Sequence, residues 1–116
     1  MPRPPDPFDP TRASVRTGLF GGQGSVKVWD LGGAKPPFTA ILLCELDPGG
    51  TVGEHVQQTD HEVVIVLSGE AVLYVNAAPH ACVPGSAVPL RLGERLSIDN
   101  ASPTEPLRYL IVKARN

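Results

Sequence analysis

Glycine and proline are spread so densely through this chain that long helices have no room. The 116 residues include 12 Gly and 13 Pro, and the longest stretch without either type, Glu54–Ser68, has fifteen residues. Proline removes a backbone donor, and glycine loses the most conformational freedom on folding, so both disfavour helix interiors. Because an average helix needs about 11–12 residues, a helical bundle is excluded. The length fits one domain with a single modest core.

Net charge, cysteine content and hydropathy exclude several classes of protein. A net charge of −2 gives no basic surface for nucleic acid or an anionic membrane, and no apolar run reaches the ~18 residues of a membrane span. Cys44 and Cys82 are too few for a disulfide framework and read as small buried side chains. The N-terminal MPRPPDPFDP lacks the apolar core of a signal peptide. We therefore expect a cytoplasmic protein with no nucleic-acid or membrane partner.

The N-terminus differs in composition from the rest of the chain. Five of the 13 prolines fall in the first ten residues, where Phe8 is the only aromatic side chain. Such a segment cannot form a core of its own. We predict that residues 1–17 form an extended or disordered arm, which is either loose or lies along a neighbouring surface through Phe8. Residues 18–116 are expected to form the single domain.

Short runs of β-type residues, cut by turn residues, follow from Ser25 onward. They are Ser25–Leu31, Thr39–Leu46, Glu62–Ser68, Ala71–Val75, Ala81–Val83, Ser86–Leu90, Arg95–Asp99 and Leu107–Ala114. This pattern is typical of an all-β sandwich or barrel, and the helices that a parallel sheet needs are missing. Ser68-Gly69-Glu70 and Asn76–Pro79 are short enough for tight reversals. We therefore expect consecutive strands to pair antiparallel.

Polar side chains gather in EHVQQTDHE, just before the most apolar of these runs. On an extended segment His55 and Gln57 point to the same side, because side chains alternate. Glu62 begins the next strand and can return beside them if the intervening loop reverses the chain. An imidazole, an amide and a carboxylate that converge in this way suit one divalent metal such as Mn, Fe, Ni or Zn.

The spacing of these residues resembles the first motif of the cupin family. That motif reads G-x5-H-x-H-x(3,4)-E-x6-G, and its positions fall on Gly49, His55, Gln57, Glu62 and Gly69.

The second cupin motif, G-x5-P-x-G-x2-H-x3-N, follows in order. Gly85, Gly93 and Asn100 match it without a gap, while Arg91 replaces the proline and Leu96 replaces the histidine. The resemblance therefore spans about half of the chain.

The resemblance implies a fold and a depleted metal site. The fold is a double-stranded β-helix, or jelly roll, with the motif residues inside the barrel. The family's metal ligands are three His and one Glu, of which His55 and Glu62 are kept. Gln57 stands at the second histidine, and Leu96 cannot coordinate a metal. His61 is no substitute, since it precedes Glu62 directly and should face the opposite side.

We therefore predict a small-molecule pocket in place of the metal. Its predicted lining is His55, Gln57, Glu62, Val64, Val66, Leu96 and Ile98, which makes it apolar with a small polar end. A buried Glu62 would either pair with His55 or hold a proton through a raised pKa.

Two other functions stay open. A metal-dependent cupin enzyme of the dioxygenase, isomerase or lyase type would use His55, Gln57 and Glu62 around one divalent ion, and a metal-free version would use His55 and Glu62 as an acid–base pair. A barrel packed solid would instead indicate a structural or interaction module. Whether the chain is an enzyme is not decided by its sequence.

The remaining features receive simpler interpretations. His80 is expected in a solvated turn, Arg91 and Arg95 on a solvated strand edge, and Gly21–Gly24 in a flexible turn. Single-domain cupins commonly dimerise, so the resemblance implies a homodimer that covers outward side chains such as Val63, Ile65 and Leu67.

Overall fold

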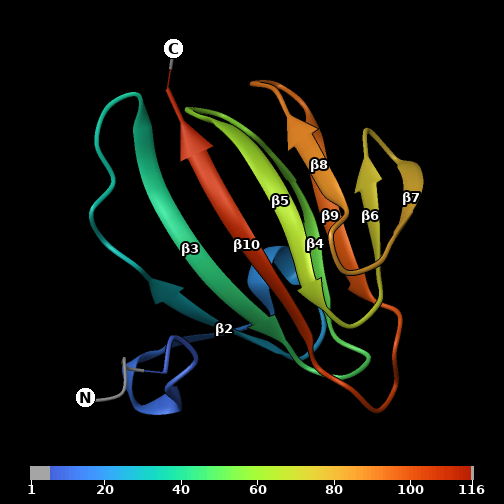
Figure 1. Cartoon of the computed structure of the whole chain (residues 1–116). Helices are drawn as coiled ribbons and strands as arrows, with labels where there is room; N and C mark the ends of the chain where they lie inside the picture. The colour runs from blue at the N-terminus through green and yellow to red at the C-terminus, as the bar shows by residue number, and fades with distance from the viewer. Residues whose placement is uncertain (1–5, 116) are drawn as a thin grey trace.

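Two antiparallel sheets face each other in the computed structural model, which describes residues 6–115 (Figure 1). The strands are β1 (Ser14–Thr17), β2 (Ser25–Asp30), β3 (Phe38–Leu46), β4 (Thr51–Val56), β5 (His61–Ser68), β6 (Ala71–Val75), β7 (Ala78–Cys82), β8 (Ala87–Leu90), β9 (Arg95–Asn100) and β10 (Leu107–Ala114). Two single-turn 3-10 helices, η1 (Pro10–Arg12) and η2 (Leu19–Gly21), flank β1. Within residues 6–115 no helix is long and apolar enough to cross a membrane.

The strand order confirms the predicted all-β jelly roll. One sheet has the order β1-β2-β3-β10-β5-β8, and the other has the order β4-β9-β6-β7. Every pairing is antiparallel, and β10, the last strand, lies between β3 and β5 at the centre of its sheet. Sequence-distant strands are therefore neighbours, as a double-stranded β-helix requires.

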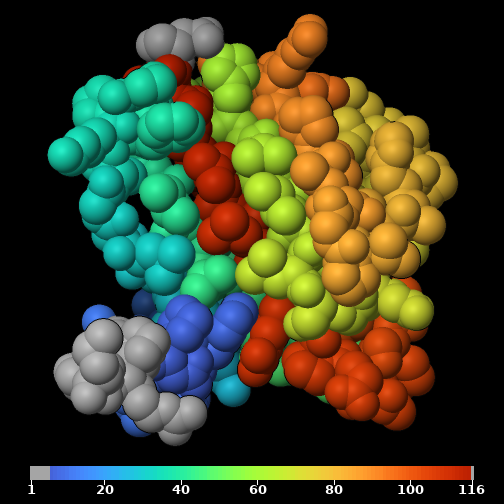
Figure 2. Space-filling model, in the orientation of Figure 1, coloured from blue at the N-terminus to red at the C-terminus, as the bar shows by residue number. Residues whose placement is uncertain are grey.

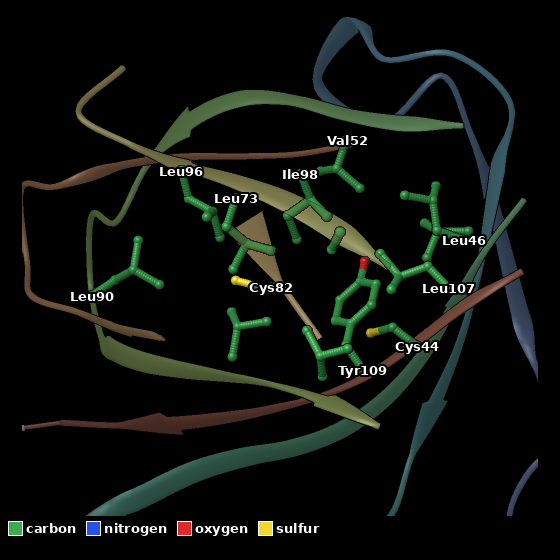
Figure 3. Packing of buried hydrophobic residues seen from close by; sticks show 14 residues of the cluster. Cys44, Leu46, Val52, Leu73, Cys82, Leu90, Leu96, Ile98, Leu107 and Tyr109 are labelled. Atoms are coloured by element: carbon green, nitrogen blue, oxygen red, sulfur yellow. The ribbon is translucent and has the colours of Figure 1, made fainter. Parts of the chain in front are cut away.

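The core lies between the two sheets and follows the alternation of the strands (Figure 3). Val64 and Val66 of β5 face it from the six-stranded sheet, and Leu96 and Ile98 of β9 face it from the other, each at most 2% exposed. All four were predicted to point inward. Val63 and Ile65, their neighbours on β5, lie on the outer face and stay partly exposed.

Two predictions about turns are wrong. Ser68-Gly69-Glu70 does not form a hairpin, because β5 pairs with β10 and β8 while β6 pairs with β7 and β9. The reversal carries the chain from one sheet to the other.

The turn predicted over Asn76–Pro79 is shorter than expected. Only Asn76 and Ala77 turn, with φ values of 50° and 69°, which suit a two-residue hairpin. His80 consequently lies on β7, exposed and opposite Leu73, and not in a turn.

The N-terminal segment folds back onto its own chain. Its last four residues form β1, which pairs with β2 and extends the six-stranded sheet. Phe8 meets the edge of Trp29 at 5.2 Å between ring centroids, and the Arg108 guanidinium lies 4.2 Å above the Phe8 ring. Trp29 Nε1 donates to the Asp9 carbonyl at 2.6 Å. Residues 1–5 of the predicted arm lie outside the described residues.

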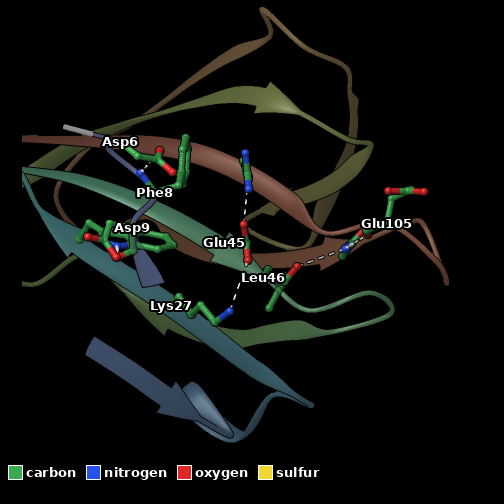
Figure 4. Close-up of polar contacts among 10 residues, drawn as sticks. Asp6, Phe8, Asp9, Lys27, Glu45, Leu46 and Glu105 are labelled. Carbon is green, nitrogen blue, oxygen red and sulfur yellow. Dashed lines mark hydrogen bonds and ion pairs between the residues drawn. The ribbon is translucent and has the colours of Figure 1, made fainter. Parts of the chain in front are cut away.

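Ionic pairs cross the outer face of the sheet next to this segment. Glu45 of β3 lies 3.7 Å from Lys27 of β2 (Figure 4) and 2.7 Å from Arg108 of β10. These exposed pairs contribute about 1 kcal/mol or less each. The outer face at this end therefore carries charged pairs beside the Phe8–Trp29 contact, whereas Val26 and Cys44 of the same strands face the core.

Candidate functional site

A cavity of about 320 Å³ lies between the sheets on the side of β1 and β2. Much of its lining is apolar and comes from both sheets, as in Val26, Val28, Leu42, Leu96, Ile98 and Ile111. Charged or titratable side chains also line it, namely Arg16, Asp30, His55, Glu62 and Lys113. A cavity of this size is at the small end of the range for ligand pockets.

Four of the residues predicted for the pocket line this cavity. They are His55, Glu62, Leu96 and Ile98. The other three, Gln57, Val64 and Val66, are buried but do not line it. β4 ends at Val56, so Gln57 lies just beyond the strand whose alternation was used to place it on the same side as His55.

His55 lies on β4 opposite Leu96 of β9. Its Nδ1 is 3.0 Å from the Gly53 carbonyl oxygen. Since a carbonyl only accepts, Nδ1 carries the proton in this contact, and Nε2 of the neutral ring is an acceptor. The imidazole also stacks on the Phe20 ring, with centroids 4.1 Å apart and planes 13° from parallel.

Two glycines allow Phe20 to reach His55. A Cβ on Gly53 would lie 1.8 Å from the Phe20 carbonyl oxygen, and a Cβ on Gly22 would lie 2.0 Å from that of Thr51. Backbone therefore lies directly on backbone where η2 meets β4. Phe20 itself adopts the left-handed region at φ 53°, which is costly for a residue with a side chain. The predicted flexible turn Gly21–Gly24 is thus held against β4.

Glu62 is the most deeply buried charged side chain of the cavity. Its side chain is 3% exposed, and Oε1 lies 3.8 Å from Lys113 Nζ on the neighbouring strand β10. Within residues 6–115, Oε2 has no hydrogen-bond partner. Burial raises the pKa of Glu62, and the nearby Lys113 opposes that shift. The carboxylate is therefore paired with Lys113, a partner that was not predicted, and its pKa is raised as one of our two alternatives required.

Gln57 and His61 lie outside the cavity lining, and each makes hydrogen bonds with neighbouring backbone groups. The Gln57 backbone accepts from Gly93 N at 2.8 Å and donates to Glu94 O at 3.0 Å, which extends the pairing of β4 with the approach to β9. Its buried Nε2 has no partner among the described residues. His61 does not line the cavity, and its Nδ1 accepts from Leu92 N at 3.1 Å.

The donors do not fit the three-histidine, one-glutamate site of the cupin motifs. Leu96 presents an apolar side chain where the third histidine would stand, and Gln57 lies outside the lining. Across residues 6–115 no three His, Cys, Asp or Glu side chains gather closely enough to hold a metal ion. We therefore derive no step that uses a metal.

Cys44 and Tyr109 form part of the cavity wall on the six-stranded sheet (Figure 3). Burial raises the pKa of the Cys44 thiol to about 12, and burial also raises the pKa of Tyr109 well above its usual value. Both groups stay protonated near neutral pH. The thiol is thus a poor nucleophile, in agreement with the prediction that Cys44 is a small buried side chain.

Most of the cavity lining was not predicted, including Arg16, Phe20 and Lys113. Lys113 could have been found, because alternation along Leu107–Ala114 puts Tyr109, Ile111 and Lys113 on one face. Arg16 and Phe20 carry no comparable signal, since they belong to a segment without an apolar pattern.

The motif residues outside the cavity stabilise the turns between the strands. Asn100 is buried, and its Nδ2 donates to the carbonyls of Leu46, Asp47 and Glu105 at 3.3, 3.0 and 2.8 Å. The motif glycines Gly49, Gly69, Gly85 and Gly93 all have positive φ. Both motifs therefore keep their structural positions while the ligand positions have changed.

Comparisons with solved structures give the same fold. A predicted oxalate decarboxylase from Thermotoga maritima superposes with a TM-score of 0.83 at 24% identity, over 90% of this chain and 92% of that one. A Cupin 2 conserved barrel domain protein from Salinispora arenicola CNS-205 gives 0.73 at 22%, over 98% and 90%.

A third similar structure is a putative sugar phosphate isomerase from Acidithiobacillus ferrooxidans. It gives a TM-score of 0.68 at 26% identity, over 80% of this chain but only 61% of that one.

No curated protein matches the chain significantly. The sequence profile of the Cupin domain matches residues 42–113, which is more than half of the chain and includes both motifs. The chain therefore belongs to the cupin domain family.

Proposed function

We propose that this chain binds a small organic molecule in the cavity between its sheets. The observation that carries the proposal is a cavity of about 320 Å³ with a largely apolar lining, at whose wall Glu62 lies buried beside Lys113. A ligand that fills this space removes apolar surface from water, and a polar group on it would bond to the polar side chains of the lining.

The donor set favours an organic ligand over an ion. Only His55 and Glu62 of the four family positions offer a coordinating atom to the cavity, and Leu96 adds apolar surface instead. Apolar walls with a few convergent polar groups are the usual form of a small-molecule site.

The test is ligand binding to protein purified without chelators or metal columns. Hexanamide serves as a neutral probe, followed by NMR chemical-shift changes. Leu96→Trp fills the cavity and should abolish the shifts, while Leu92→Trp, at a position 38% exposed, should leave them. Leu96→Phe is the milder variant if Leu96→Trp does not fold. Near-stoichiometric Mn, Fe, Ni or Zn by elemental analysis, released by His55→Ala, would overturn the proposal.

A catalytic role for the same cavity is the alternative. Leu96 and Ile98 belong to the core and also line the cavity, and burial raises the pKa of Glu62, which favours a carboxyl that holds a proton and can donate it. His55 would be its partner. This version predicts turnover that both His55→Gln and Glu62→Gln remove, whereas a binding module keeps ligand affinity in at least one of them.

We also propose a homodimer through the outer face of the six-stranded sheet. Figure 2 shows β5 and β10 open to solvent on this face, between β3 and β8. Val63, Ile65 and Val112 are only partly buried there, and Leu67 is 41% exposed. Light scattering of Ile65→Lys should report a monomer, and Ala81→Lys, exposed on β7 of the four-stranded sheet, is the control. A monomeric wild-type chain would contradict the proposal.

A further inference from the structure

Glu62, the carboxylate of the cupin metal motif, has a positive charge of the chain's own beside it. Lys113 Nζ lies 3.8 Å from Glu62 Oε1, and the two side chains are 35% and 3% exposed. No other lysine or arginine of residues 6–115 lies within 4.0 Å of this carboxylate. A buried carboxylate is costly without a counter-charge. Lys113 therefore does for Glu62 what a bound cation would otherwise do.

The register of the six-stranded sheet holds Lys113 in this place. Lys113 of β10 lies directly opposite Glu62 of β5 on one side and opposite Ala40 of β3 on the other. Lys113 and Glu62 both line the cavity. The ammonium and the carboxylate therefore meet at the inner wall of the barrel, and their pairing is a property of the strand order.

The other charged groups of this region have partners or lie on more distant strands. Asp60 acts electrostatically on Glu62, but its Oδ1 is 3.4 Å from Arg115 Nε. Asp30 on β2 and Arg16 on β1 also line the cavity, but β3 stands between those strands and β10. The charge beside the carboxylate is therefore set by the ammonium group.

The position of this ammonium group bears directly on metal binding. A carboxylate oxygen holds Zn²⁺ at about 2.0–2.2 Å, so an ion on Glu62 Oε1 would lie no more than about 6 Å from Lys113 Nζ. At that separation, repulsion between charges of +2 and +1 weakens binding about tenfold even at the dielectric constant of bulk water, and more strongly in a buried site. Lys113 therefore opposes a divalent ion at this carboxylate.

We propose that Lys113 replaces the metal ion of the cupin site: its ammonium group neutralises Glu62 and keeps divalent cations out of the cavity. The changes at Gln57 and Leu96 remove metal ligands, and Lys113 adds a cation where the remaining carboxylate needs one. This inference does not rest on the proposed function, because it holds whether or not an organic molecule binds.

Mn²⁺ titration of the full chain tests the exclusion of divalent ions. The readout is the paramagnetic broadening of the amide NMR signals of His55 and Glu62. Lys113→Gln removes the charge and keeps a hydrogen-bond donor, so it should reach the same broadening as the wild type at about tenfold lower Mn²⁺ concentration. Lys113→Arg keeps the charge and should behave like the wild type.

Lys27→Gln is the matched control. Lys27 is also paired with a carboxylate, at 3.7 Å from Glu45 Oε1, and it is 39% exposed, but it lies on the outer face. Its replacement should leave the broadening at the two cavity signals unchanged. Equal broadening in the wild type and in Lys113→Gln would overturn the exclusion of divalent ions.

Glu62→Gln locates the effect. Combined with Lys113→Gln, it should abolish the gain in Mn²⁺ affinity, because the carboxylate is the group that would hold the ion. A gain that persists in this double variant would show that the ion binds elsewhere, and it would overturn the proposal.

Folding of the variants tests the counter-charge itself. If Lys113→Gln does not fold, Lys113→Met, which is closer to lysine in length, takes its place. If neither folds, adding Glu62→Gln should restore a folded chain, because it removes the uncompensated charge. Failure of this rescue would overturn the role of Lys113 as counter-charge. Absence of hexanamide binding, by contrast, would contradict the proposed function and leave this inference intact.

Discussion

The part of the chain that matches the cupin domain and the part before it make different contributions to the molecule. Residues 42–113 contain the motif glycines, Asn100, β5 and most of β10, and they carry His55 and Glu62. Residues 6–41 add β1, η2 and β2, and with them Arg16, Phe20 and Asp30 of the cavity lining. The family region thus supplies the frame and the remains of the metal site, whereas the preceding segment supplies one wall of the cavity. The cavity lining therefore includes residues that the family match does not cover.

The largest effect should follow from Gly53→Ala, which tests whether the N-terminal segment is an integral part of the fold. The added methyl group would lie 1.8 Å from the Phe20 carbonyl oxygen, a collision with the backbone that no side-chain movement can relieve. We expect a loss of about 3 kcal/mol or more in the free energy of unfolding, measured by chemical denaturation. Glu54→Ala, its exposed neighbour, is the control, and an unchanged stability would show that η2 is only loosely attached.

The second-largest effect tests the region that matches the cupin domain, by restoring histidines at the positions of the family's metal ligands. Gln57→His combined with Leu96→His restores the residue types of the cupin motifs, and we expect Ni²⁺ or Mn²⁺ affinity to rise about 100-fold, or about 2.8 kcal/mol. Calorimetry of the metal titration measures it, and each single variant should gain less. Because Leu96 is 1% exposed, the double variant should also lose stability. A metal affinity equal to that of the wild type would show that the barrel no longer places these four side chains in a geometry that coordinates a metal ion.

A smaller effect should follow from Phe8→Ala, which tests how firmly the described part of the arm is attached. Phe8 loses its edge-on contact with Trp29 and the Arg108 guanidinium above its ring. Aromatic pairs and exposed cation–π contacts are each worth about 0.5–1.5 kcal/mol, so we expect about 1–2 kcal/mol in chemical denaturation. Phe38→Ala, at an exposed aromatic away from the arm, should cost less. The reverse order would indicate that the arm adds nothing to stability.

The smallest effect concerns the pH dependence of stability. The folded-state pKa of Glu62 is raised above its ordinary value of 4.5, so the protonated form favours the folded state. The contribution of Glu62 is fully present below pH 4.5 and is lost as the pH rises through the folded-state pKa.

Glu62→Gln removes this titration. The variant should gain stability relative to wild type as the pH rises above 4.5 and through the folded-state pKa of Glu62, by chemical denaturation at several pH values. Glu70→Gln, at an exposed turn, should show no such trend. A wild-type advantage that grows with pH would mean that the Lys113 pair outweighs the burial of the carboxylate.

The sequence predicted the strands well because their side-chain patterns are local. The runs at Ala71–Val75 and Leu107–Ala114 coincide with β6 and β10. β1 and β4 were missed, since Ser14–Thr17 is fully exposed and Thr51–Val56 is interrupted by Gly53. The prediction that β6 pairs with the strand before it was also wrong, because a short turn can either form a hairpin or carry the chain to the other sheet.

The site was less predictable, because it depends on contacts between distant segments. Glu62, Leu96 and Ile98 were placed toward the cavity from motif positions and alternation. The pairing of Glu62 with Lys113 requires β5 and β10 to be neighbours, a fact of topology rather than of local pattern. The stacking of Phe20 on His55 depends in turn on an unusual backbone conformation at Phe20.

The close approach of η2 to β4, which requires glycine at both Gly22 and Gly53, has a consequence for relatives of this chain. Since the atoms in contact belong to the backbone, a larger residue at either position could not be offset by a smaller side chain elsewhere. The two positions should therefore change together during evolution. Related chains with glycine at both should share the aromatic cover over the histidine, and those that have lost either glycine should have a cavity open on this side. This pair of glycines could sort cupins into those with a covered cavity and those with an open one.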